Sequence, residues 1–195
     1  GFDWEDIGRR DALEVLADEQ KRFKPNPKRI YLTGHSMGGH GTWQVGAHYP
    51  DKFAAIGPSA GWISFFTYAG GVTYPNPTPM ESMLLRATNA SQTLHLKTNF
   101  LQQGVYVIHG DADDNVPVAQ ARQMRTELKD HPNLKWHEQS GAGHWWDVSP
   151  EPGADCVDWK PMFDWFRKLQ IPQSQNVNHL DFTTISPGIS ADCHW

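Results

Sequence analysis

The segment GHSMG at 34–38 matches the G-x-S-x-G pattern, with Ser36 at its centre. An apolar stretch at 29–33 (RIYLT) comes before it, and a helix is predicted over 39–49. Between a strand and a helix, such a serine stands on a sharp, strained turn, and glycines beside it let backbones approach closely. We therefore predict that Ser36 is a nucleophile and that the backbone N–H of Met37 donates to a developing oxyanion.

A serine hydroxyl is a weak nucleophile and needs a positioned base. Of ten histidines, His144 follows the last predicted strand, lies in the loop GAGHWW and comes after every acidic candidate in the chain. Hydrolases with this kind of turn have the order Ser, then Asp or Glu, then His. The loop after VYVIH offers Asp111, Asp113 and Asp114, and position alone does not choose among them. One of them is expected to orient the imidazole of His144.

Strands alternate with helices along the chain. The pattern predicts helices near 3–22, 39–49, 80–87, 118–129 and 155–170, and strands near 29–33, 53–58, 105–109 and 134–139. Such alternation is typical of an α/β fold, in which a mostly parallel sheet carries helices on both faces. Residues 60–78, rich in glycine, proline and aromatics, are expected to form a long loop.

The predicted elements fill residues 1–170, which we interpret as one catalytic domain. Residues 171–178 have the composition of a linker, and residues 179–195 are expected to begin a following β-domain. The strand at 29–33 should be central and paired on both sides, and one partner strand could only precede residue 1. We therefore expect the 195 residues to be part of a longer polypeptide and, alone, to be poorly soluble and nearly inactive.

Composition excludes several function classes. The net charge is −5 and the basic residues are scattered, which argues against a nucleic-acid groove or a polybasic membrane patch. No apolar run approaches the ~18 residues of a membrane span. The opening GFDWEDIGRRD is not a signal peptide, and a leader further upstream would make the protein secreted or periplasmic. Two cysteines, Cys156 and Cys193, leave open whether they pair, and oligomeric state is not predicted.

A metal site is not predicted. Asp111, Asp113 and Asn115 are spaced like the start of a calcium loop, but Val116 and Arg122 stand where that loop needs glycine and glutamate. No Cys/His set has zinc spacing, so neither a metal nor another cofactor is expected.

The motifs GHSMGGHGTW, HGDADDNVPVAQAR and GAGHWW together resemble the catalytic domain of the prolyl oligopeptidase family and the similar dienelactone-hydrolase-like esterases over about residues 1–170. The family loop usually reads H-G-x-x-D-x-x-V, and its aspartate is the triad member, which implies Asp113. In some relatives an asparagine two places later touches substrate, which implies Asn115. The family fold is an eight-stranded α/β-hydrolase, and the four predicted strands look like its last four, the C-terminal half. In the family, an upstream loop supplies the second oxyanion donor.

The resemblance implies a serine hydrolase with a Ser-Asp-His triad and an acyl-enzyme intermediate, acting on a small-molecule ester or a short peptide. The sequence has no propeller domain and no Glu-Glu pair for a peptide amino terminus, so an ester is favoured, with a peptidase as the alternative. A non-catalytic binding module is the rival of another class. The candidate substrate contacts are Asn115, Trp62, Trp145 and His35. The two tryptophans lie near the site loops, and His35 should point away from the serine hydroxyl.

Overall fold

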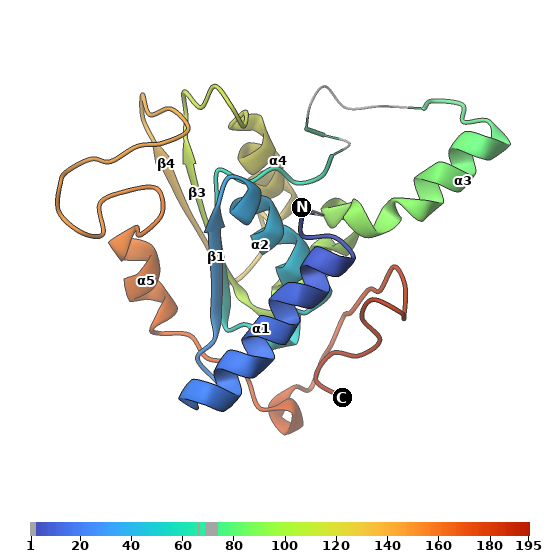
Figure 1. The fold of residues 1–195 in the computed structure, drawn as a ribbon, viewed down its shortest axis with the longest axis horizontal. Coiled ribbons are helices and arrows are strands. Elements are labelled where there is room, and N and C mark those ends of the chain that lie inside the picture. The colour runs from blue at the N-terminus through green and yellow to red at the C-terminus, as the bar shows by residue number, and fades with distance from the viewer. Residues whose placement is uncertain (1–2, 66, 69–73) are drawn as a thin grey trace.

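The computed structural model describes residues 3–65, 67–68 and 74–195. A parallel four-stranded sheet lies at its centre, with strand order β1-β2-β3-β4 (Figure 1). The strands are β1 (Tyr31–His35), β2 (Ala55–Ser59), β3 (Gly104–Gly110) and β4 (Leu134–Gln139). The α-helices are α1 (Ile7–Phe23), α2 (Met37–His48), α3 (Pro79–Ala87), α4 (Ala119–Glu127) and α5 (Lys160–Phe166). The α/β class with a parallel sheet is thereby confirmed.

Helices cover both faces of the sheet. One face packs against α2, α4 and the 3₁₀ helix Thr93–Gln102, in a core that includes Trp43, Phe100 and Met124. The other face packs against α5 through Met162 and Phe166. Each fully buried side chain of this size stabilises the fold by roughly 1.5–3 kcal/mol. The double cover buries the two central strands, β2 and β3, along their whole length, whereas β1 and β4 are only partly buried. The packed sheet fixes the positions of the loops at the strand ends.

Parallel pairing aligns the carboxyl ends of the strands at one edge of the sheet. His35 pairs with Ser59, and Gly110 pairs with Gln139. The loops that begin at Ser36 and Asp111 therefore share this edge with the loop that carries His144. At the other side of the sheet, β1 has β2 as its one strand partner among the described residues.

The helices α1, α4 and α5 are shorter than predicted, and α1 and α5 begin several residues later than expected. Residues 3–6 form turns before α1, and the Trp4 ring lies against Gly41 of α2. A helix that continued through residue 4 would place this ring elsewhere. The last helix begins at Lys160, because the Asp155 carboxylate accepts hydrogen bonds from the backbone N–H groups of Val157 and Asp158 and holds a turn there. The described part of the predicted loop 60–78 has no helix or strand, and its residues 66 and 69–73 lie outside the described residues.

Residues 179–195 contain no strand or helix, although their sequence had strand-like stretches. They pack on the catalytic region: the buried Asn99 side chain exchanges two hydrogen bonds with the backbone of Thr183, and the Tyr49 hydroxyl donates to Ile189 O. Their role as the start of a further domain stays a prediction. Cys156 and Cys193 are both buried and unbonded to each other.

Candidate active site

Ser36 sits on the turn between β1 and α2 with φ 58° and ψ −116°. A non-glycine residue with positive φ stores strain, of the order of 1–3 kcal/mol, that the surrounding structure must hold. Here the Ser36 backbone N–H donates to Ser59 O at 2.9 Å, which ties the turn to the neighbouring strand β2. The side chain is thereby held at the carboxyl edge of the sheet, at the N-terminus of α2.

Glycine is required around this turn at two positions. A Cβ on Gly34 would lie 2.5 Å from Gly38 O, and one on Gly39 would lie 2.3 Å from Ser59 O. A Cβ on Gly38 would meet nothing within 4 Å. The expectation that both glycines of the motif are needed for close approach is therefore wrong for Gly38. Its backbone packs against Gly34, but a side chain at Gly38 itself would meet no other atom.

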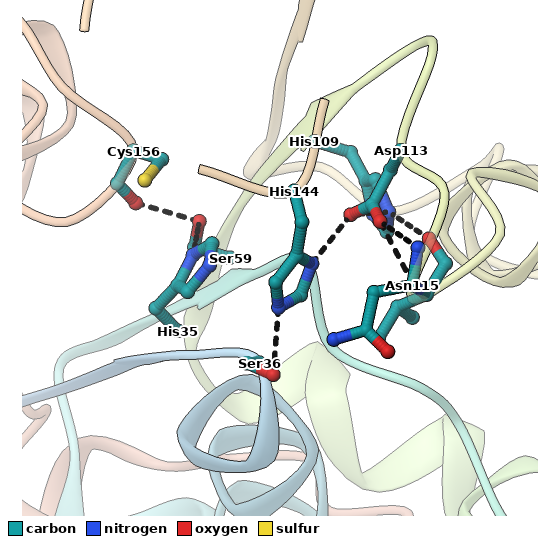
Figure 2. Close-up of polar contacts among 9 residues, drawn as sticks. His35, Ser36, Ser59, His109, Asp113, Asn115, His144 and Cys156 are labelled. Carbon is teal, nitrogen blue, oxygen red and sulfur yellow. Dashed lines mark hydrogen bonds and ion pairs between the residues drawn. The ribbon is translucent and has the colours of Figure 1, made fainter. Parts of the chain in front are cut away.

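His144 lies between Ser36 and Asp113 (Figure 2). Its Nε2 is 2.9 Å from Ser36 Oγ, and its Nδ1 is 2.9 Å from Asp113 Oδ2. The imidazole is 7% exposed and the Asp113 side chain is fully buried. Since an ionised carboxylate only accepts, Nδ1 carries the proton and donates to Asp113, which leaves the Nε2 lone pair for the Ser36 hydroxyl.

Asp113 is held as a carboxylate by its neighbours. Burial alone would raise its pKa, but the hydrogen bond from His144 and those from the backbone N–H groups of Val116 and Asn115 outweigh burial and hold the pKa below its ordinary value. The two backbone N–H groups both donate to Oδ1, at 2.8 and 2.9 Å, so Oδ2 is left to face His144. A buried negative charge thus stands behind the imidazole.

The other two aspartates of this loop face elsewhere. Asp111 Oδ1 accepts from the backbone N–H of Gly141, which joins the β3 loop to the loop that carries His144. Asp114 is exposed. Of the three residues that position alone did not separate, Asp113 is the one in contact with His144.

His109, whose place at the end of a predicted strand indicates a packed or loop-bonding histidine, also contacts Asp113. It is buried at the end of β3, where its Nε2 donates to Val116 O at 2.9 Å and lies 3.2 Å from Asp113 Oδ2. Burial lowers its pKa, so the ring is neutral near pH 7. Its place directly before the GDADD loop was the available signal, since a strand-end histidine can bond the loop that follows.

The predicted substrate contacts are dispersed around the triad. The His35 ring lies beside that of His144, with centroids 4.8 Å apart, and its Nδ1 is 3.1 Å from Ser59 Oγ. Burial, then the nearby His144, lower the His35 pKa to about 4. Trp145 is 68% exposed and its ring lies 4.1 Å from that of His35. Asn115 is exposed beside Asp113.

Trp62 and Met37 complete the set. Trp62 is buried and stacks on the His40 ring of α2 at 4.7 Å. Met37 is the first residue of α2, where backbone N–H groups have no intrahelical acceptor and can meet an anion. Trp146, the next residue after Trp145, packs against His137 and Trp159.

Neither a metal-binding cluster nor a membrane-spanning helix occurs among the described residues. In the described parts of the chain, no three His, Cys, Asp or Glu side chains gather in a way that could hold a metal ion. None of the helices described here has the length and apolar character needed to cross a membrane.

Sequence and structure comparisons identify relatives. The family model for the prolyl oligopeptidase family matches residues 2–171. An uncharacterized secreted protein of Arthroderma benhamiae is 38% identical over 117 residues, which is 59% of this chain and 13% of that protein. An uncharacterized peptidase of Bacillus subtilis, YuxL, is 29% identical over 157 residues, 71% of this chain and 24% of that protein. The chain thus spans less than a quarter of the length of each.

Solved structures share the fold. A puromycin-hydrolyzing peptidase of Mycobacterium tuberculosis has a TM-score of 0.59 and 21% identity, over 73% of this chain and 22% of that one. A thermostable esterase has a TM-score of 0.54 and 20% identity, over 83% of this chain and 37% of that one. Because the family model covers most of the chain, the protein belongs to the prolyl oligopeptidase family, and the solved structures show that its described residues have the α/β-hydrolase fold.

Proposed function

We propose that Ser36, His144 and Asp113 form a catalytic triad that hydrolyses carboxylic esters. The observation that carries the proposal is the continuous chain of hydrogen bonds from Ser36 Oγ to His144 Nε2 and from His144 Nδ1 to Asp113 Oδ2, each 2.9 Å long. Nucleophile, base and orienting acid are thereby within the contact range that acyl transfer requires.

The reaction follows from these contacts. Ser36 Oγ attacks the substrate carbonyl carbon while its proton passes to His144 Nε2, and the developing oxyanion lies toward the Met37 N–H at the start of α2. The C–O bond to the alcohol then breaks, and His144 returns the proton to the departing oxygen. Water attacks the acyl-enzyme by the same route and releases the acid. Asp113 stays ionised throughout and stabilises the imidazolium.

Esters are the first substrate class to test for a chemical reason. An amide nitrogen leaves only when it is protonated as its bond to the carbonyl carbon breaks, whereas an alkoxide or phenoxide is a better leaving group. A triad that cleaves amides therefore also cleaves activated esters, but the converse does not hold. Peptidase activity on short peptides is the second candidate, and the prolyl oligopeptidase family membership supports it.

A substrate panel separates the two. We expect the full-length protein to hydrolyse nitrophenyl esters of short acids faster than aminoacyl-nitroanilides, with both activities lost in Ser36→Ala. Faster cleavage of the nitroanilides would make the protein a peptidase. Retention of ester hydrolysis in a correctly folded Ser36→Ala variant would refute the proposed nucleophile.

We also infer that residues 1–170 are the catalytic domain, which the family match over 2–171 supports, followed by the linker 171–178 and the segment 179–195. Secretion is a further proposal, supported by the secreted relative from Arthroderma benhamiae. Detection of the protein in culture medium or in the cell pellet tests it.

A further inference from the structure

A pocket lies next to His144 in the segment that connects this histidine to α5. Its volume is about 380 Å³, and it is lined by Trp145, Trp146, Asp147, Asp155, Cys156 and Val157. This volume is within the range of ~300–1,000 Å³ that small-molecule sites occupy.

The walls of the pocket are fixed by backbone pairing. Asp147 and Asp155 form an antiparallel bridge, and the Cys156 N–H donates to Trp146 O at 3.1 Å. A neighbouring bond runs from Val148 N to Ala154 O, also 3.1 Å. The segment therefore closes on itself and holds the two ends of the pocket wall together.

The pocket is joined to the triad on one side of His144. The Trp145 ring is 5.6 Å from the His144 ring and 4.1 Å from the His35 ring. The buried Ser59 hydroxyl donates to Cys156 O at 2.6 Å and contacts His35, the chain neighbour of Ser36. In Figure 2, Cys156, Ser59 and His35 lie on the side of His144 opposite to Asp113.

We propose that this pocket binds the leaving group of the substrate; the proposal rests on the triad assigned above. His144 Nε2 must deliver its proton to the departing atom, so the leaving group has to lie on the side of Ser36 that faces this histidine. The carbonyl oxygen points to the Met37 N–H instead. Trp145 directly follows His144 in the chain, and its ring lies 5.6 Å from the ring of this proton donor.

The lining indicates which leaving groups are bound. The indole of Trp145 is 68% exposed and offers a flat apolar face, and Trp146 and Val157 extend the apolar surface. The charged side chains of the lining are Asp147 and Asp155, with no Lys, Arg or His among the lining residues. The pocket selects flat, apolar alcohols and rejects those with a negative charge.

The test varies the alcohol at a constant acyl group in the full-length protein. Ethyl, benzyl, 2-naphthylmethyl and 4-carboxybenzyl butyrate share one acyl-enzyme, and their alcohols are similar in basicity, so differences in kcat/KM report on binding of the leaving group in the acylation step. We expect kcat/KM to rise from the ethyl to the naphthylmethyl ester and to be lowest for the carboxybenzyl ester.

Two variants test the apolar wall. In Trp145→Ala we expect the naphthylmethyl-to-ethyl ratio of kcat/KM to fall on the order of 10-fold, because an aromatic contact and its buried area are lost. Val157→Trp adds a large ring to the pocket lining and leaves the residue next to His144 unchanged, so it should lower the same ratio even if Trp145→Ala disturbs the histidine. Trp195→Ala is the matched control, since Trp195 is similarly exposed, at 67%, in the C-terminal segment.

The carboxylates are tested by Asp147→Asn and Asp155→Asn. The side-chain oxygen of asparagine can still accept the hydrogen bonds that backbone N–H groups donate to each aspartate, so the loop should persist. Each change should reduce the discrimination against 4-carboxybenzyl butyrate by about two- to five-fold, as expected for partly solvated charges. Asp18→Asn, on the exposed side of α1, should leave this discrimination unchanged.

Two results separate the failure of this proposal from the failure of the proposed function. If hydrolysis depends on Ser36 but Trp145→Ala and Val157→Trp leave the ratio unchanged, or change only the preference between acetyl and phenylacetyl esters of ethanol, the leaving-group assignment is wrong. If no ester in the series is hydrolysed in a Ser36-dependent way, the proposed function itself fails.

Discussion

Replacement of Asp113 by asparagine should invert the hydrogen bonding of His144. Oδ1 of Asp113 accepts two backbone N–H groups, from Asn115 and Val116, and an amide NH₂ cannot take that place without losing both bonds. The asparagine oxygen will therefore occupy the Oδ1 site and the NH₂ will face His144. Nδ1 must then become the acceptor, so the imidazole proton moves to Nε2. A protonated Nε2 can no longer receive the proton of the Ser36 hydroxyl.

The expected loss in kcat is about 10³–10⁴-fold, the upper value being the effect of the same change in the best-studied triad. The assay is hydrolysis of 4-nitrophenyl butyrate, with thermal unfolding to confirm that the variant folds. Asp111→Asn and Asp114→Asn are the controls, because Asp111 can keep its bond to Gly141 through the amide oxygen and Asp114 is exposed. A loss below 10-fold in Asp113→Asn, or an equal loss in Asp114→Asn, would refute the reasoning.

Further predictions concern the turn and the buried histidines. Gly34→Ala should lower the free energy of unfolding by about 1–3 kcal/mol through overpacking, whereas Gly38→Ala, with open space at its Cβ, should be neutral or stabilise the helix by up to about 1 kcal/mol; urea denaturation compares them. His48 is buried and His35 is half-buried, and the pKa values of both are lowered from 6.5 to about 4, so the unfolded chain binds more protons in this interval. The free energy of unfolding should therefore be highest above pH 6.5 and fall as the pH drops toward 4. His48→Gln should reduce the dependence of this free energy on pH. An unchanged pH dependence in the variant would count against burial of a neutral His48.

The sheet was predictable from sequence because both of its faces are buried. The central strands β2 and β3 are buried along their whole length and are rich in apolar residues. The predicted stretch at 134–139 also coincides with a strand, β4, although β4 is mostly polar and only partly buried. Helix ends were less predictable, since they depend on tertiary contacts. The Trp4 ring packs on Gly41, and the Asp155 carboxylate holds a turn before α5, and neither contact has a signature in the local sequence.

The site shows the same division. The order Ser36, Asp113, His144 follows from motif and topology, and these three side chains are in contact in the structure, while their catalytic roles stay predictions. What sequence could not supply is the set of contacts between distant segments. The hydrogen bond from Ser59 to Cys156 O joins residues 97 positions apart and places the pocket wall beside the triad. Only the folded chain brings them together.

Labelling by a fluorophosphonate probe, followed by peptide mapping by mass spectrometry, tests the central claim most directly. The probe reacts with a serine only when a base activates its hydroxyl, so it reports on the Ser36–His144 contact and not on substrate choice. We predict a single adduct, on Ser36 of the full-length protein, which is absent in Ser36→Ala and much slower to form in His144→Ala. A folded protein that is not labelled, or whose adduct lies on another serine, would contradict the account.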